Sequence, residues 1–461
     1  MATQLQPGKA TTLLRQLGFV SATALVVSNM VGTGIFGTTG FMVGQLGDAK
    51  IILAAWAVGS LFALAGAFSY SELGINFPSS GGEYVYLTRA FGPTWGFMTG
   101  WTSFFAGFSA PIAAAALTFS DYLGHFFPVL RQESGFTIGA GALTLKFGGA
   151  QWMASLLILV FTALNCFGVE RVAKIQNVLT GGKIVVIILF VFGGFLYGNG
   201  SWSHLSEPAV RTSTTALPAQ FVVTLLWVMV SYSGWNAATY VAEELKRPER
   251  TLPAALAAGT ALVTALYLGL NLVFFYAMPL EQMKDQIAVG SLAASNLFGP
   301  EVAGVFAAAM ALSIVSTVSA MVTIGPRVYY AMAQNGAFFR KAAVVHPKWR
   351  TPTNAILAQG ACAVLMTLTP FPQLVFFIGM SLTFFTVLSV ASLFVFRRRE
   401  GWQTLKPVSF CFPAIPAAYI LVGGCMTIYG IIWQPKASFI ALANIAAGAA
   451  IYRLWLRDRK A

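Results

Sequence analysis

The sequence predicts an all-α polytopic membrane protein with twelve transmembrane helices. Of its 461 residues, 57% are hydrophobic and only 9% are charged, an apolar content that a soluble globular chain of this length does not need. The apolar residues gather in runs of about 20, which is the length that crosses a bilayer as a helix. Polar breaks separate these runs, so the chain is expected to cross the membrane repeatedly.

The runs can be placed in order along the chain. The first six cover residues 17–43, 51–73, 93–122, 151–169, 176–197 and 219–242, and the second six cover 253–278, 302–332, 354–369, 373–396, 408–433 and 437–456. The ninth run is the shortest of the twelve. Residues 1–16 and 457–461 are predicted to be tails.

The distribution of basic residues predicts the orientation. With an even number of spans both termini lie on one side, and the loops and tails on that side carry 21 Lys and Arg against 6 on the other. Because positively charged loops remain in the cytoplasm, both termini are predicted to be cytoplasmic. This pattern accounts for the net charge of +13, and the basic residues form no patch interleaved with aromatics, so no nucleic-acid partner is expected.

Several function classes are excluded by missing motifs. The sequence has no HExxH, GxSxG or P-loop motif, so it gives no basis for a membrane protease, lipase or ATPase. By this span map the acidic residues and histidines fall in loops or at span ends, Glu72 included. No cofactor and no metal are expected. A channel would need pores lined with repeated charges or carbonyls, which the sequence does not offer.

Lys183 is the one charged residue well inside a predicted span. It lies in the run 176–197, roughly 10 Å past its start at 1.5 Å per residue. An ammonium at that depth costs a few kcal/mol or more, so it indicates a functional site. The alternative is a lysine that reaches back to the interface along its aliphatic stem.

Two runs contain matching irregularities. The first holds Gly32-Thr33-Gly34, and the sixth holds Ser231 through Asn236. Small residues of this kind serve close helix packing, or they mark an unwound segment that faces a cavity. Interruptions at corresponding positions of two halves indicate a transporter site. Each half, residues 17–200 and 218–399, would hold five spans, and an odd number gives the second half the opposite membrane orientation.

The chemistry of such a site follows from the backbone. Half-helix N-termini suit a carboxylate, and carbonyls freed at half-helix C-termini suit an ammonium. A site with both groups and no buried acidic side chain fits an amino acid.

The sequence also resembles a known family. The matching segments are Gly32 through Phe36, Pro78 through Leu87 (PSSGGEYVYL), Ala90 through Pro93, Leu117 through Tyr122, Gly182-Lys183, Gly234-Trp235-Asn236, Glu243-Glu244, Pro248 and Leu252-Pro253. They resemble the amino acid–polyamine–organocation (APC) superfamily, most closely the L-type amino acid transporters and their bacterial relatives. The resemblance implies a LeuT-like core of five plus five inverted-repeat helices with helices 1 and 6 broken, alternating access, and two appended helices in residues 408–456.

The resemblance also implies roles for individual residues. The backbone around Thr33 and Gly34 would hold the substrate carboxylate, and carbonyls near Met30, Val230 and Ser233 would hold the amine. The implied substrate-binding set is Met30, Val31, Gly32, Thr33, Gly34, Ile35, Val230, Ser231, Ser233, Gly234 and Asn236. Lys183 would stand where sodium-coupled relatives bind sodium. Ser316 and Ser319 would be its neighbours, or alternatively ordinary small residues at a helix contact.

The sequence departs from the family pattern in three ways. Val230 stands where an aromatic gate is common, so closure over the substrate would need a larger substrate or another residue, with Trp227 and Phe36 as candidates unless they only serve packing. Ser233 stands where glycine is common. The loop 123–150 lacks the cysteine through which animal members bind a heavy chain, so no disulfide-linked partner is expected. The missing cysteine favours a free-standing carrier of the bacterial type, in an inner membrane.

The function expected from the resemblance is sodium-independent exchange of neutral L-amino acids. If Lys183 lost its proton during the cycle, transport would instead be proton-coupled symport. Cationic amino acids or polyamines are the other alternative, and they would require an acidic side chain facing the site.

Overall fold

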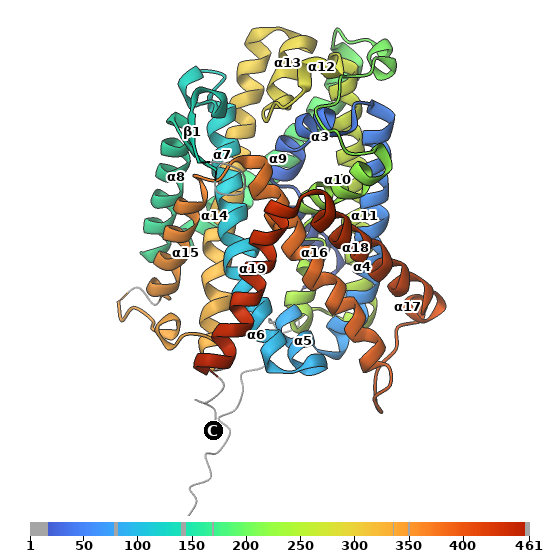
Figure 1. Cartoon of the computed structure of the whole chain (residues 1–461), viewed down its shortest axis with the longest axis vertical. Coiled ribbons are helices and arrows are strands. Elements are labelled where there is room, and N and C mark those ends of the chain that lie inside the picture. Colours follow the sequence, from blue (N-terminus) through green and yellow to red (C-terminus); the bar gives the residue numbers. More distant parts are fainter. Residues whose placement is uncertain are drawn as a thin grey trace, which may run out of the picture.

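The computed structural model of the chain is a bundle of helices with one small β-hairpin (Figure 1). It describes residues 17–77, 82–139, 144–167, 170–334, 336–348 and 351–456. The predicted tails 1–16 and 457–461 and residues 78–81 of the PSSGGEYVYL segment lie outside these ranges. Most helices run along the long axis, with α12 (Leu280–Met283) and α13 (Val289–Phe298) at the upper end of Figure 1.

The first half of the chain contains short helices between the long ones. Its elements are α1 (Phe19–Met30), α2 (Thr33–Gly37), α3 (Thr39–Leu46), α4 (Ala49–Asn76), α5 (Glu83–Phe91), α6 (Pro93–Thr102), the π-helical η1 (Ser103–Ser109), α7 (Ala110–Leu123), η2 (Pro128–Leu130), η3 (Gln132–Ser134), β1 (Phe136–Ile138), β2 (Leu145–Phe147), α8 (Gly149–Cys166) and α9 (Glu170–Tyr197). Strands β1 and β2 pair antiparallel, with Thr137 opposite Lys146.

Within the described residues of the second half, the regular elements are all helices. Its elements are η5 (Trp202–Ser206), α10 (Leu217–Ser231), η6 (Ala237–Glu244), α11 (Pro248–Ala277), α12 (Leu280–Met283), α13 (Val289–Phe298), α14 (Pro300–Gln334), η7 (Arg340–Ala343), α15 (Thr353–Met366), α16 (Phe371–Phe396), α17 (Lys406–Phe410), α18 (Ala414–Trp433), α19 (Pro435–Ile451) and η8 (Tyr452–Leu456).

The helices confirm an all-α polytopic membrane protein. Within the described residues, nine helical segments are long and apolar enough to cross a bilayer. Shorter apolar helices occupy the fifth, sixth and ninth predicted spans, at Gly181–Tyr197, Leu217–Ser231 and Thr353–Met366. Twelve crossings therefore stay a prediction.

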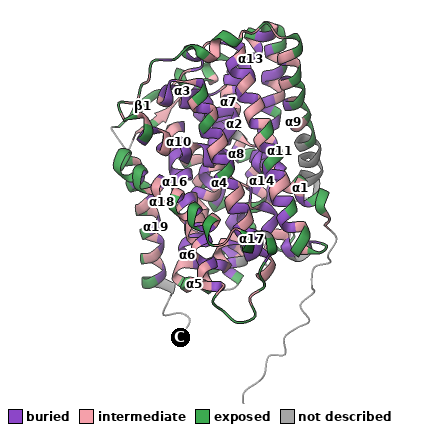
Figure 2. Ribbon diagram, turned by 90° about the vertical axis from the view of Figure 1, so that its right-hand side faces the viewer, coloured by how far each residue is buried: buried purple, intermediate pink, exposed green. Residues whose placement is uncertain are grey.

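Hydropathy alone missed the short helices between spans. Helix α5 lies where the sequence predicted a loop, and α12 and α13 lie between the seventh and eighth predicted spans. Each has 10 residues or fewer, so none forms an apolar run of membrane length. Buried residues concentrate along the middle of the bundle (Figure 2), where α4 packs on α11 and α7 on α14.

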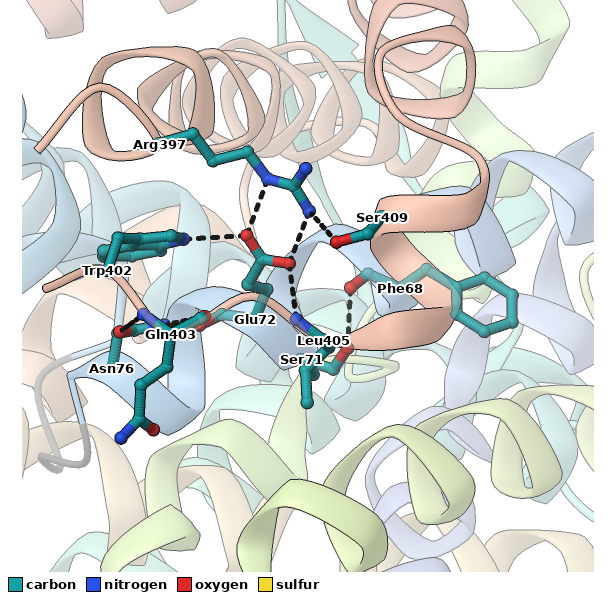
Figure 3. A network of polar contacts seen from close by, with 9 residues as sticks. All are labelled: Phe68, Ser71, Glu72, Asn76, Arg397, Trp402, Gln403, Leu405 and Ser409. Atoms are coloured by element: carbon teal, nitrogen blue, oxygen red, sulfur yellow. Dashed lines mark hydrogen bonds and ion pairs between the residues drawn. The ribbon is translucent and has the colours of Figure 1, made fainter.

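A buried ion pair fixes α4 to the segment after α16 (Figure 3). The carboxylate of Glu72 accepts hydrogen bonds from Arg397 Nε at 2.7 Å and Nη2 at 2.6 Å. Trp402 Nε1 and the backbone N–H of Leu405 donate to it at 2.8 and 3.0 Å. Glu72 is fully buried, and a buried carboxylate is tolerated only when it is paired and hydrogen-bonded in this way.

Replacing Arg397 with glutamine should lower the free energy of unfolding by about 3 kcal/mol, because the Glu72 carboxylate would stay buried without its cationic partner. Denaturant unfolding in detergent would measure the change. Arg340→Gln, at an exposed position of η7, is the control and should change stability by no more than about 0.5 kcal/mol. Equal effects of the two variants would contradict the role given to the ion pair.

Candidate functional site

The first predicted span is interrupted at Val31 and Gly32. Helix α1 ends at Met30, and the N–H of Val31 still donates to the carbonyl of Val27 at 2.9 Å. Gly32 is then extended, with φ −134° and ψ −154°, before α2 begins at Thr33. An interruption of this kind leaves the last carbonyls of α1 and the first N–H groups of α2 without their helical partners.

The sixth predicted span is interrupted after Ser231. Residues 232–236 form turns between α10 and η6. Gly234 has φ +97°, a backbone conformation that favours glycine. A Cβ there would also lie 2.8 Å from the backbone C and O atoms of Asn29 in α1. Glycine is therefore required at this position both by the turn and by the close approach of α1.

The two interruptions contact each other. A Cβ on Gly34 would collide with the Cα of Ser231. The hydroxyl of Thr38 lies 3.3 Å from that of Ser231. The hydroxyl of Tyr267, on α11, is 2.6 Å from the carbonyl oxygen of Met30 and 2.9 Å from that of Ser231. Tyr267 thus joins the last residues of the two half-helices. Sequence analysis did not find it, because a tyrosine in an apolar span is usually a packing residue.

Lys183 reaches the first interruption from α9. Its ammonium donates to the carbonyl of Val31 at 2.5 Å and lies 3.3 Å from that of Ser28. The side chain is 4% exposed, which is incompatible with a lysine that extends to the interface. In the part of the chain that the structure describes, its partners are backbone carbonyls. Lys183 therefore satisfies acceptors that the end of α1 leaves open.

Ser316 and Ser319 are buried on α14. The hydroxyl of Ser316 donates to the carbonyl of Ser313 at 2.6 Å, and the carbonyl of Ser319 accepts from Thr323 at 2.7 Å. Among the described residues, neither serine hydrogen-bonds Lys183 directly.

A cavity lies beside the two interruptions. Its enclosed volume is only about 30 Å³, which is room for about one water molecule. The lining residues are Asn29, Met30, Gly32, Gly34, Pro111, Ala114, Val230, Ser233, Met321, Phe371, Val375 and Ile378. Five of them were predicted as site residues, and the set contains no charged side chain.

Local backbone irregularity shapes the wall formed by α7. Pro111 lacks an N–H and lies at the start of α7, just after the π-helical segment η1, and π-helical turns occur frequently at functional sites.

Some residues predicted to bind substrate do not line the cavity. Of these, Val31, Ile35 and Ser231 are buried, and the side chain of Thr33 lies outside the described set.

Aromatic rings pack behind one wall of the cavity. Phe371 lines it and stacks on Phe41 with 5.7 Å between ring centres, and Phe41 meets Trp227 edge-on at 5.9 Å. Trp227 was one of the two predicted covering residues. The other, Phe36, is buried against Tyr122 instead. Asn29 of α1 also lines the cavity and is exposed.

A polar network ties η6 to α5 near the lower end. Asn236 donates its amide to Glu83 at 2.6 Å, Tyr240 donates its hydroxyl to Glu83 at 2.6 Å, and Tyr70 donates at 3.2 Å. The amide of Asn236 is thus directed at α5. Sequence reasoning placed Glu83 in a loop and missed this network, because nothing in the spacing pairs Glu83 with residues 153 and 157 positions away.

Comparison with known proteins gives consistent matches. The family described as amino acid permease matches residues 17–454. The large neutral amino acids transporter small subunit 2 of Mus musculus is 29% identical over 461 residues, covering 97% of this chain and 82% of that protein. The serine/threonine exchanger SteT of Bacillus subtilis is 28% identical, covering 97% and 98%. The b(0,+)-type amino acid transporter 1 of Mus musculus is 27% identical, covering 97% and 89%.

Gly34→Ala should destabilise the protein by about 1–3 kcal/mol, since the added methyl group meets the backbone of Ser231 and must push α2 away from α10. Gly424→Ala is the matched control, because a methyl group added to this helical glycine of α18 would have nothing within 4 Å of it. Unfolding midpoints in detergent would compare the two. A Gly34→Ala variant as stable as Gly424→Ala would show that the two interruptions are not in contact.

Proposed function

Because this chain belongs to the amino acid permease family, we propose that it exchanges neutral L-amino acids across a cell membrane without sodium. The proposed architecture has twelve crossings. Residues 17–200 and 218–399 form two inverted repeats of the LeuT-like type, residues 408–456 add two helices, and both termini are cytoplasmic. The relatives named above include an exchanger of serine and threonine and a transporter of large neutral amino acids.

The observation that carries the proposal is the pair of helix interruptions facing one uncharged cavity. Backbone N–H groups at the start of α2, around Thr33 and Gly34, suit the substrate carboxylate. Carbonyls at Met30, Val230 and Ser233 suit its amine. A zwitterion matches both sets. A cationic side chain would find no acidic partner among the residues that line the cavity, which favours neutral amino acids over cationic ones and polyamines.

Sodium independence is supported by the position of Lys183. Its ammonium already supplies a positive charge to the carbonyls of Ser28 and Val31, which are hard oxygen ligands of the kind that small cations prefer. A fixed cation at the end of α1 makes a bound metal ion unnecessary there.

Alternating access is supported by the unequal closure of the cavity. Phe371 lines the cavity and packs on Phe41, which packs on Trp227, whereas the lining residue Asn29 is exposed. We infer that a substrate would enter beside Asn29 in this conformation. The opposite conformation would separate the rings and bring α1 against the cavity.

Purified protein in sodium-free proteoliposomes should take up labelled serine, threonine or leucine only when the vesicles are preloaded with unlabelled amino acid. The reason is that an empty carrier with its interruptions unfilled reorients slowly. Equal uptake into empty vesicles would contradict exchange, and stimulation by an inward proton gradient would then identify symport. Uptake of lysine or putrescine in place of neutral substrates would establish the cationic alternative.

Lys183→Met should reduce exchange at least tenfold, because it leaves the carbonyls of Val31 and Ser28 buried without a donor while keeping the length of the side chain. Lys436→Met, at an exposed position of α19, is the control and should exchange at the wild-type rate. If sodium partly restored exchange by Lys183→Met, the ammonium would be established as a replacement for a metal ion. Wild-type exchange by Lys183→Met would refute its role.

A further inference from the structure

An apolar groove lies between the lower part of α4 and the α17–α18 region, away from the cavity described above. Phe68 and Ser69 line it from α4, and Val408, Phe410, Cys411 and Ile415 line it from the other side. Its volume is about 250 Å³. The hydroxyl of Ser69 donates to the carbonyl of Ala65 at 3.0 Å, so this polar group is satisfied within α4. The groove is therefore a hydrocarbon surface.

The groove faces outward. The side chain of Phe410 is 90% exposed, and α17 projects from the bundle beside α18 and α4 (Figure 1). The ring of Phe68 points away from the Glu72 cluster (Figure 3). Since α4 and α18 are both long and apolar enough to cross a bilayer, the neighbour that meets this surface is membrane lipid.

Basic residues border one end of the groove. Lys406 begins α17 and precedes Phe410 by four positions, so the two share a helix face. The guanidinium of Arg397 lies 4.0 Å from the ring centre of Phe412, next to Cys411, and Arg398 follows in the chain. Arg397 is neutralised by Glu72. Arg398 and Lys406 are exposed, and within the described ranges neither has a side-chain hydrogen bond or ion pair.

We propose that this groove binds an anionic phospholipid, with one acyl chain against Phe68 and Phe410 and the headgroup phosphate held by Arg398 and Lys406. Apolar surface binds the acyl chains of any lipid, so the groove alone does not discriminate between lipids with different headgroups. Lys406, which begins α17, and Arg398, which follows α16, are exposed cations that favour a headgroup with net negative charge over a zwitterionic one. A lipid seated here would join α4 to α17 and α18, whereas the Glu72–Arg397 pair joins α4 to the segment after α16.

The test measures lipid retention and does not depend on transport. The full-length protein would be exchanged into detergent with equal amounts of phosphatidylglycerol and phosphatidylcholine of identical chains, and bound lipid would be counted by native mass spectrometry. We expect phosphatidylglycerol to be retained at least fivefold over phosphatidylcholine. The double variant Arg398→Gln/Lys406→Gln should lose this preference, and Arg340→Gln, an exposed arginine of η7, should keep it.

A second variant tests the groove itself. Cys411→Trp fills it, so the retention of phosphatidylglycerol should fall several-fold although both cations remain. Glycerol phosphate in excess should not displace the lipid, because a free headgroup lacks the acyl chain. Equal retention of the two lipids by wild-type protein, an unchanged preference in the double variant, or displacement by glycerol phosphate would each overturn the proposal. Thermal unfolding of every variant, measured alongside, identifies any loss caused by misfolding.

Discussion

Two helices of this protein are interrupted in the middle of an apolar bundle, and other helices supply hydrogen-bond donors to the backbone groups that the interruptions leave unpaired. A helix that ends in a low-dielectric interior leaves carbonyl and N–H groups that water cannot reach. The carbonyls of Ser28 and Val31 meet the ammonium of Lys183, and those of Met30 and Ser231 meet the hydroxyl of Tyr267. Both donors come from helices outside the interrupted pair. Gly32, Gly34, Val230 and Ser233, which lie at the two interruptions, line the cavity beside them.

The features predicted from sequence were those with a local signal. The two interruptions could be predicted because glycine and turn-forming residues are recognised by residue type alone. They occur at Gly32 through Gly34 and at Ser231 through Asn236. Lys183 stood out because a charge inside an apolar run is costly. Its partners could not be predicted, since they are backbone carbonyls that carry no sequence signature, and the contact spans 152 positions.

Other features could not be predicted from one sequence at all. Glu72 was assigned to a span end because hydropathy falls there, and its pairing with Arg397 depends on a fold that brings together residues 325 positions apart. Tyr267 resembles any aromatic packing residue until the positions of Met30 and Ser231 are known. Helix α5 is too short and too polar to be detected by hydropathy, yet it carries Glu83 to η6. In each case the role of the residue depends on tertiary contacts, which local composition does not reveal.

The hydroxyl of Tyr267 has one proton and two carbonyl neighbours. At any moment it can donate to Met30 or to Ser231, so one of these buried carbonyls always lacks a full hydrogen bond. An ammonium group bound beside them, as proposed above, has three protons to donate and would supply the hydrogen bond that Tyr267 cannot. Under that proposal the substrate would link the two interrupted helices more firmly than Tyr267 alone does, so their movement would depend on occupancy of the space between them.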